Sequence, residues 1–140
     1  MRAVGAIIWL PLLTAASVAQ SVNYKSYDAT SGVATRLDFY ATARKDCSPS
    51  PPPPIVVVTP PKHGLLTIRR GTVKSTRIAE CPNFQTDANV VFYTPGRGYA
   101  GEDEVVYEVR DSKGAVSLYN LKITVKENKA PPPGNLEQKL

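Results

Sequence analysis

The segment YTPGRGYAGEDEVVYEVRD, residues 93–111, decides the fold of this chain. In its second half apolar or aromatic residues alternate with charged ones, so that Val105, Tyr107 and Val109 share one face. This period-two pattern is typical of a strand with one buried side. The glycines and the proline before it predict a turn that leads into the strand. We therefore interpret the segment as structural, with its acidic residues solvated.

The rest of the chain also reads as short strands separated by turn residues. We expect them at residues 21–32 (a weak edge strand), 36–43, 55–59, 65–69, 73–78, 90–94, 104–110 and 116–125. The continuous β-branched run IVVVT, residues 55–59, predicts a fully buried strand. Leu37, Phe39 and Ala41 form the expected apolar face of the second strand. No amphipathic segment of helical length follows the first 20 residues, so the sequence predicts an all-β antiparallel sandwich of about seven strands.

The ends of the chain differ in composition from its middle. Residues 1–19 combine Arg2, an apolar run and the small residues that precede a cleavage site after Ala19, which predicts a secretory signal peptide. Residues 20–126 form the predicted domain, and residues 127–140 are polar and proline-broken, as in a disordered tail. No later segment is apolar enough to span a bilayer. We expect a secreted or periplasmic protein.

Cys47 and Cys81 are the two cysteines of the chain. In an exported protein such a pair predicts a disulfide, with a metal pair or a nucleophilic thiol as alternatives. A metal site usually needs four ligands, and His63 is the only histidine. The proline-rich residues 48–54 predict a rigid polyproline connector, although such a run can also serve as a docking ligand.

Several motifs of the second half resemble the bacterial Ig-like and cadherin-like repeats of secreted and surface proteins. The resemblance covers residues 60–125 and rests on Pro61, His63, Gly64, Tyr93, Thr94, Pro95, Gly98, Tyr99, Gly101, Asp103, Tyr107, Asp111 and Gly114. Val105 stands where the repeats usually have an aromatic residue, and this chain carries one domain rather than an array. The resemblance implies a Greek-key, Ig-like sandwich without enzymatic activity. The spacing also resembles the tyrosine corner, which implies that the Tyr107 hydroxyl bonds to upstream backbone.

Three kinds of functional site compete with structural roles. Glu102, Asp103, Glu104 and Asp111 could hold calcium, but the EF-hand spacing is absent and turn roles are favoured. His63 could serve a hydrolase, yet no nucleophile motif accompanies it, so a turn residue is favoured. A basic hairpin around residues 70–72 could bind phosphate or carboxylate groups, through Arg69, Arg70, Lys74 and Arg77, or could only protect a sheet edge.

The net charge of +5 would suggest nucleic acid in a cytoplasmic protein, but export redirects the expectation to envelope or extracellular partners. We expect a non-catalytic, exported Ig-like module without a cofactor. It would bind a protein or glycan partner through end loops, an exposed strand edge or the basic hairpin, or it would be structural. The alternative is a binder of polyanions such as acidic glycan or lipopolysaccharide, and a hydrolase ranks third.

Overall fold

The computed structural model describes residues 20–76 and 80–129. Within them the chain forms β1 (Ser21–Thr30), β2 (Thr35–Ala41), β3 (Ile55–Thr59), β4 (Gly64–Ser75), β5 (Phe84–Pro95), β6 (Gly101–Arg110) and β7 (Val116–Lys126). The described residues include no helix, which confirms the all-β prediction. The predicted signal peptide, Arg77 and residues 130–140 of the predicted tail lie outside the described residues. The described ranges hold no helix that is long and apolar enough to cross a membrane.

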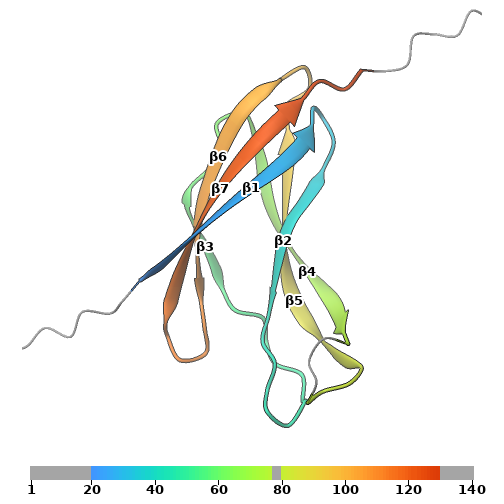
Figure 1. Cartoon of the computed structure of the whole chain (residues 1–140), viewed down its shortest axis with the longest axis vertical. Helices are drawn as coiled ribbons and strands as arrows, with labels where there is room; N and C mark the ends of the chain where they lie inside the picture. The colour runs from blue at the N-terminus through green and yellow to red at the C-terminus, as the bar shows by residue number, and fades with distance from the viewer. Residues whose placement is uncertain (1–19, 77–79, 130–140) are drawn as a thin grey trace, which may run out of the picture.

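The strands form two sheets, with the orders β1-β7-β6-β3 and β2-β5-β4 (Figure 1). Four of the five strand pairings are antiparallel, but β1 runs parallel to β7 through ten residue pairs. The expectation of a purely antiparallel sandwich is wrong at this pair. The connection between β1 and β2 crosses from one sheet to the other, so β1 adds to the edge of the sheet that already contains β7.

The core lies between the two sheets, where the alternating positions of β6 and β7 meet the second half of β5. Val105 and Tyr107 of β6 are fully buried, as are Leu121 and Ile123 of β7. The alternation that predicted these two strands is therefore confirmed. The core cluster is completed by Ala29, Leu37, Val91, Tyr93, Val109 and Val125.

The predicted face of β2 is wrong after Leu37. The pairing with β5 shifts register between Arg36 and Asp38, so Leu37 is an extra residue in a β-bulge. A bulge reverses the side on which later side chains lie. Phe39 is consequently 47% exposed, while Tyr40 packs against the core.

The predicted hairpin at residues 70–72 is wrong, because β4 is one continuous strand. It pairs with β5 without interruption from Gly64 opposite Pro95 to Ser75 opposite Phe84. Gly71 lies opposite Ala88 and is not among the residues with positive φ, which a tight hairpin turn would require. The length of β5 allows all of β4 to pair with it.

The two halves of β5 bury opposite faces. Phe84, Thr86 and Ala88 are buried in the first half, and Val91, Tyr93 and Pro95 in the second. The first half lies beside the predicted disulfide, which the structure confirms with a Cα–Cα distance of 5.6 Å between Cys47 and Cys81. The following proline-rich loop runs along this part of β5. There Ser50 is bonded through both its N–H and its carbonyl to the Thr86 hydroxyl, each at 3.3 Å, and Asn89 donates to the Pro53 carbonyl.

Candidate functional site

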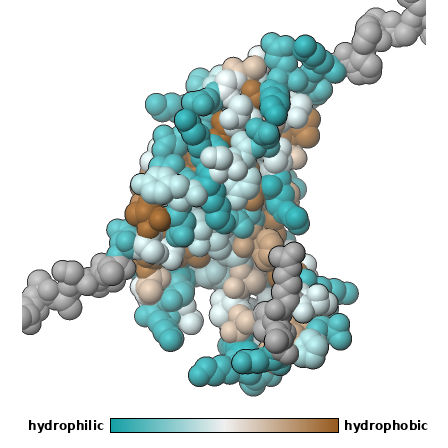
Figure 2. Space-filling view, in the orientation of Figure 1, coloured by the Kyte–Doolittle hydropathy of each residue, from teal (hydrophilic) through white to brown (hydrophobic). Residues whose placement is uncertain are grey.

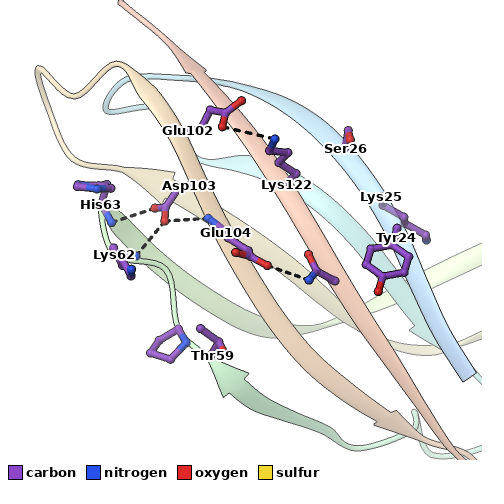
Figure 3. Close-up of a pocket in the computed structure, with 12 residues that line it drawn as sticks. Tyr24, Lys25, Ser26, Thr59, Lys62, His63, Glu102, Asp103, Glu104 and Lys122 are labelled. Atoms are coloured by element: carbon purple, nitrogen blue, oxygen red, sulfur yellow. Dashed lines mark hydrogen bonds and ion pairs between the residues drawn. The ribbon is translucent and has the colours of Figure 1, made fainter. Parts of the chain in front are cut away.

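Asp103 faces the core at the start of β6 and is only 5% exposed. Its Oδ1 accepts hydrogen bonds from the backbone N–H groups of Lys62 and Glu104, and its Oδ2 accepts one from the His63 N–H, all at 2.9 Å (Figure 3). Its Oδ2 also accepts a hydrogen bond of 2.8 Å from the Tyr93 hydroxyl. Burial alone would raise the pKa of Asp103, but these donors outweigh it and lower the pKa below its ordinary value of 3.8. The expectation that the acids of this segment are solvated is therefore wrong for Asp103.

Asp103 thus ties three separate parts of the sequence motif together. The turn before β4 binds the carboxylate through its backbone N–H groups, and Tyr93 of β5 binds it through its hydroxyl. The carboxylate itself belongs to β6. Gly64 belongs to the same unit, because a Cβ there would lie 2.5 Å from a ring carbon of Tyr93 and 2.7 Å from the Thr94 carbonyl oxygen. Gly101, with φ at +139°, precedes the carboxylate. These residues maintain the fold of this end of the sandwich.

Asp111 and Gly114 belong to the turn between β6 and β7. The Asp111 carboxylate accepts hydrogen bonds from the N–H groups of Lys113 and Ala115, at 2.8 and 2.9 Å. Gly114 has a φ of +83°, which glycine adopts without steric cost. Both residues therefore shape the turn.

His63 lies in the bend before β4 and its ring stacks on that of Tyr99, with centroids 4.1 Å apart and planes 6° from parallel. The Tyr99 hydroxyl donates to the Glu102 carbonyl at 2.6 Å. The His63 ring is therefore occupied by an aromatic contact, and it is the backbone N–H that meets Asp103.

An open groove of about 620 Å³ lies on the outer face of the β1-β7-β6-β3 sheet (Figure 3). The polar side chains on the floor of the groove bind one another: Lys122 forms an ion pair of 3.5 Å with Glu102, and Asn120 donates to Glu104 at 2.8 Å. The remaining lining comes from β1, from the end of β3 and the bend after it, and from β6: Tyr24, Lys25, Ser26, Thr59, Pro60, Lys62, His63 and Asp103. Within the described residues no group of three or more His, Cys, Asp and Glu side chains could hold a metal ion.

A polar cluster inside the sandwich was not anticipated from the sequence. Asp38 accepts hydrogen bonds from the Lys25 ammonium and, at 3.4 and 3.2 Å, from the hydroxyls of Tyr27 and Tyr40. The Tyr40 and Tyr107 hydroxyls are 2.7 Å apart. The tyrosine-corner expectation is therefore wrong: the Tyr107 ring is buried, but its hydroxyl meets a side chain of β2. This contact depends on the bulge at Leu37, which turns Tyr40 inward. The sequence pattern gave no sign of the bulge.

The predicted basic patch is divided between two faces of β4. Arg69 points to the same side as Phe92, with its guanidinium carbon 5.6 Å from the ring centroid. Because side chains alternate along a strand, Arg70 and Lys74 lie on the opposite side. Arg70 and Lys74 therefore share one face of β4, four positions apart, and Arg69 lies on the other face.

The exposure of strand β3 is the largest departure from the predicted burial. The residues expected to be fully buried are exposed: Val56 by 57%, Val57 by 39% and Val58 by 53%. The strand pairs with β6 alone and forms one edge of its sheet. On the face shown in Figure 2, by contrast, hydrophilic side chains predominate and hydrophobic ones gather in small separate patches.

The backbone of β3 is also open along its outer edge. Arg110 donates its N–H to the Pro54 carbonyl at 3.2 Å, which makes this a hydrogen-bonded pair of the antiparallel ladder. Such pairs alternate along the strands, so Val56 also bonds to β6 while Ile55 and Val57 point their N–H and C=O groups away from it. No strand among the described residues lies on that side.

Comparisons with known proteins add little to this description. No protein-family model matches the chain, and no curated protein matches it. One solved chain, from a structure of PbICP-C in complex with falcipain-2, aligns at 9% identity with a TM-score of 0.32, over 80% of this chain and 96% of that chain. A similarity this weak carries no argument about fold or function.

Proposed function

We propose that this chain is an exported, non-catalytic Ig-like module that works by binding or structure in the bacterial envelope or extracellular space. The strand order supports the Ig-like part. If the strands are lettered A to G in chain order, B, E and D form one sheet and C, F and G the other, as in immunoglobulin domains, while A pairs with G and not with B. The bacterial assignment rests on the motif shared with bacterial repeats, and export on the composition of residues 1–19.

A binding role is carried by one observation, the exposed valine edge of β3. Three adjacent β-branched side chains and an open row of backbone groups meet there. Soluble proteins usually protect such an edge with charges, prolines or a bulge, or cover it. Strand β3 is bordered by Pro54 and Pro60 and shifts register between Val57 and Thr59. Here β3 carries no charged residue. An added strand would satisfy the backbone groups and bury the valines at the same time.

The non-catalytic part is supported by the state of the candidate catalytic groups. Asp103 is fully engaged in holding the turn before β4, and the His63 ring is stacked on Tyr99. The two carboxylates on the groove floor, Glu102 and Glu104, interact with Lys122 and Asn120. These contacts support a structural role for the residues.

A pull-down from envelope extract tests the binding role. We expect the purified protein to retain a partner that a Val56→Glu variant loses, because the added charge lies in the edge that binds. Leu65→Glu is the matched control, since Leu65 is 66% exposed on β4, an edge strand of the other sheet. Retention by the control but not by Val56→Glu is the expected result. Equal retention by both variants would remove β3 from the function.

Polyanion binding remains a second candidate, supported by the positive net charge, which is +5 for the whole sequence and falls by one when Arg2 leaves with the signal peptide, and by the shared face of Arg70 and Lys74. If it holds, reversing both charges should lower the salt concentration at which the protein elutes from a heparin column. Reversing Arg69, which lies on the other face, is the control and should change elution less. Elution at low salt by all three proteins would exclude this candidate.

A further inference from the structure

We infer that the partner of β3 is a second copy of this chain, bound edge to edge and antiparallel about a two-fold axis. The two copies would then share one continuous sheet through their β3 strands. This inference rests on the proposed function, because it names the partner of the same strand edge.

The charge distribution of the edge strands favours a neutral, self-complementary partner. The other three edges carry charged side chains: Lys25 and Asp28 on β1, Arg36 and Asp38 on β2, and Arg69, Arg70 and Lys74 on β4. Such charges oppose the pairing of like edges. Strand β3, with the sequence IVVVT, has none. It is therefore the edge on which a second identical strand meets no charge repulsion.

The open backbone groups fix the register of the contact. Ile55 and Val57 both point their N–H and C=O groups outward, and each such residue needs a partner that does the same. A two-fold axis through the Val56 pair places Ile55 opposite Val57 of the second copy, and Val57 opposite Ile55. All the outward groups of both residues are then hydrogen-bonded. A shift of the axis to Val57 would leave those of Ile55 unpaired.

The side chains agree with this register. Val56, on the outer face of the sheet, meets Val56 of the second copy, while Ile55 and Val57 meet on the inner face. Pairs of β-branched residues are favourable across strands. Pro54 and Pro60 border the strand and lack an N–H, so the pairing ends there. Because the contact uses the same edge in both copies, it closes as a dimer and does not propagate.

Glu108 makes the central pair sensitive to charge. It lies opposite Val56 in the register between β3 and β6. In the dimer the row across the sheet would read Glu108, Val56, Val56, Glu108. Val56→Glu would place four carboxylates in that row, whereas Val56→Lys in one copy and Val56→Glu in the other would place opposite charges in the central pair.

Sedimentation velocity over a concentration series tests the inference. We expect the purified protein to dimerise reversibly with a dissociation constant below about 200 μM, as a specific contact of modest size does. The dissociation constant should rise at least about tenfold in Val56→Glu, since both the valine contact is lost and like charges meet. An equimolar mixture of Val56→Glu and Val56→Lys should form a heterodimer more tightly than either variant forms a homodimer.

Two controls separate this inference from the proposed function and from misfolding. Leu65→Glu should leave the dimer unchanged, and the thermal unfolding of Val56→Glu should show a folded protein. A monomeric wild type would overturn the inference, as would a dimer that tolerates Val56→Glu or a mixture without a heterodimer. A monomer that still captures an envelope partner through Val56 would refute the second copy and leave the proposed function standing. A monomer that captures nothing would refute both the second copy and the binding role of β3.

Discussion

Replacing Asp103 with alanine is expected to lower the free energy of unfolding by about 3 to 5 kcal/mol, because a buried carboxylate with several donors is removed while the donors stay. The N–H groups of Lys62 and His63 and the Tyr93 hydroxyl would lose their acceptor. Urea denaturation followed by tyrosine fluorescence or circular dichroism measures the change. Glu104→Ala is the control, since this exposed neighbour bonds only to Asn120 by its side chain. We expect the control to cost less than about 1 kcal/mol.

The effect of Asp103 should depend on pH with a defined sign. The pKa of its carboxyl is lowered in the folded chain, although burial opposes this, because the ionised form accepts the bonds of the turn. Its stabilisation is therefore fully present above the unfolded value, about 3.9, and is lost as the pH falls through the folded value. The difference between wild type and Asp103→Asn should be large at pH 7 and shrink below about pH 4. A difference that stays constant down to pH 2 would contradict a charged Asp103.

Removing the disulfide is expected to cost about 4 kcal/mol in the chain-entropy model, because the bridge closes a long loop. Cys47 and Cys81 are separated by 34 positions, and the bridge fixes the proline-rich loop to the start of β5. A Cys47→Ser and Cys81→Ser double variant should unfold at lower denaturant than the oxidised wild type. Reduced wild type should match the variant.

A second variant separates the bridge from the contacts of the loop. Thr86→Val removes the hydrogen bonds to Ser50 and keeps the disulfide, so it should cost only about 1 kcal/mol. If the double variant is no less stable than Thr86→Val, the bridge does not act through loop closure.

The sequence predicted what depends on local pattern. The alternation in β6 and β7 identified buried Val105 and Leu121 correctly, because β6 packs one face on the core from Asp103 to Val109 and β7 does so from Leu121 to Val125. The disulfide followed from the pairing of two cysteines in a chain expected to be exported. The residues of the 93–111 motif were singled out as a group, but two of the backbone donors to Asp103, Lys62 and His63, lie 41 and 40 positions before it.

What the sequence could not predict depends on the order of strands in the sheets. An apolar run such as IVVVT has the same pattern in a central strand and at an edge, so only the position of β3 beyond β6 exposes it. The bulge at Leu37 leaves no compositional sign, and it moves Tyr40 rather than Phe39 to the inside. Arg70, Gly71 and Thr72 resemble a turn locally, but a long neighbouring strand keeps them extended.

The parallel pairing of β1 and β7 has a mechanical consequence. The two strands point the same way, so the chain enters β1 at one end of the domain and leaves β7 at the opposite end (Figure 1). A pulling force applied across these two ends would load the ladder between β1 and β7 along the strands. The interstrand bonds would then have to shear together and could not open one after another. A module built in this way is suited to hold tension between whatever precedes β1 and whatever follows β7.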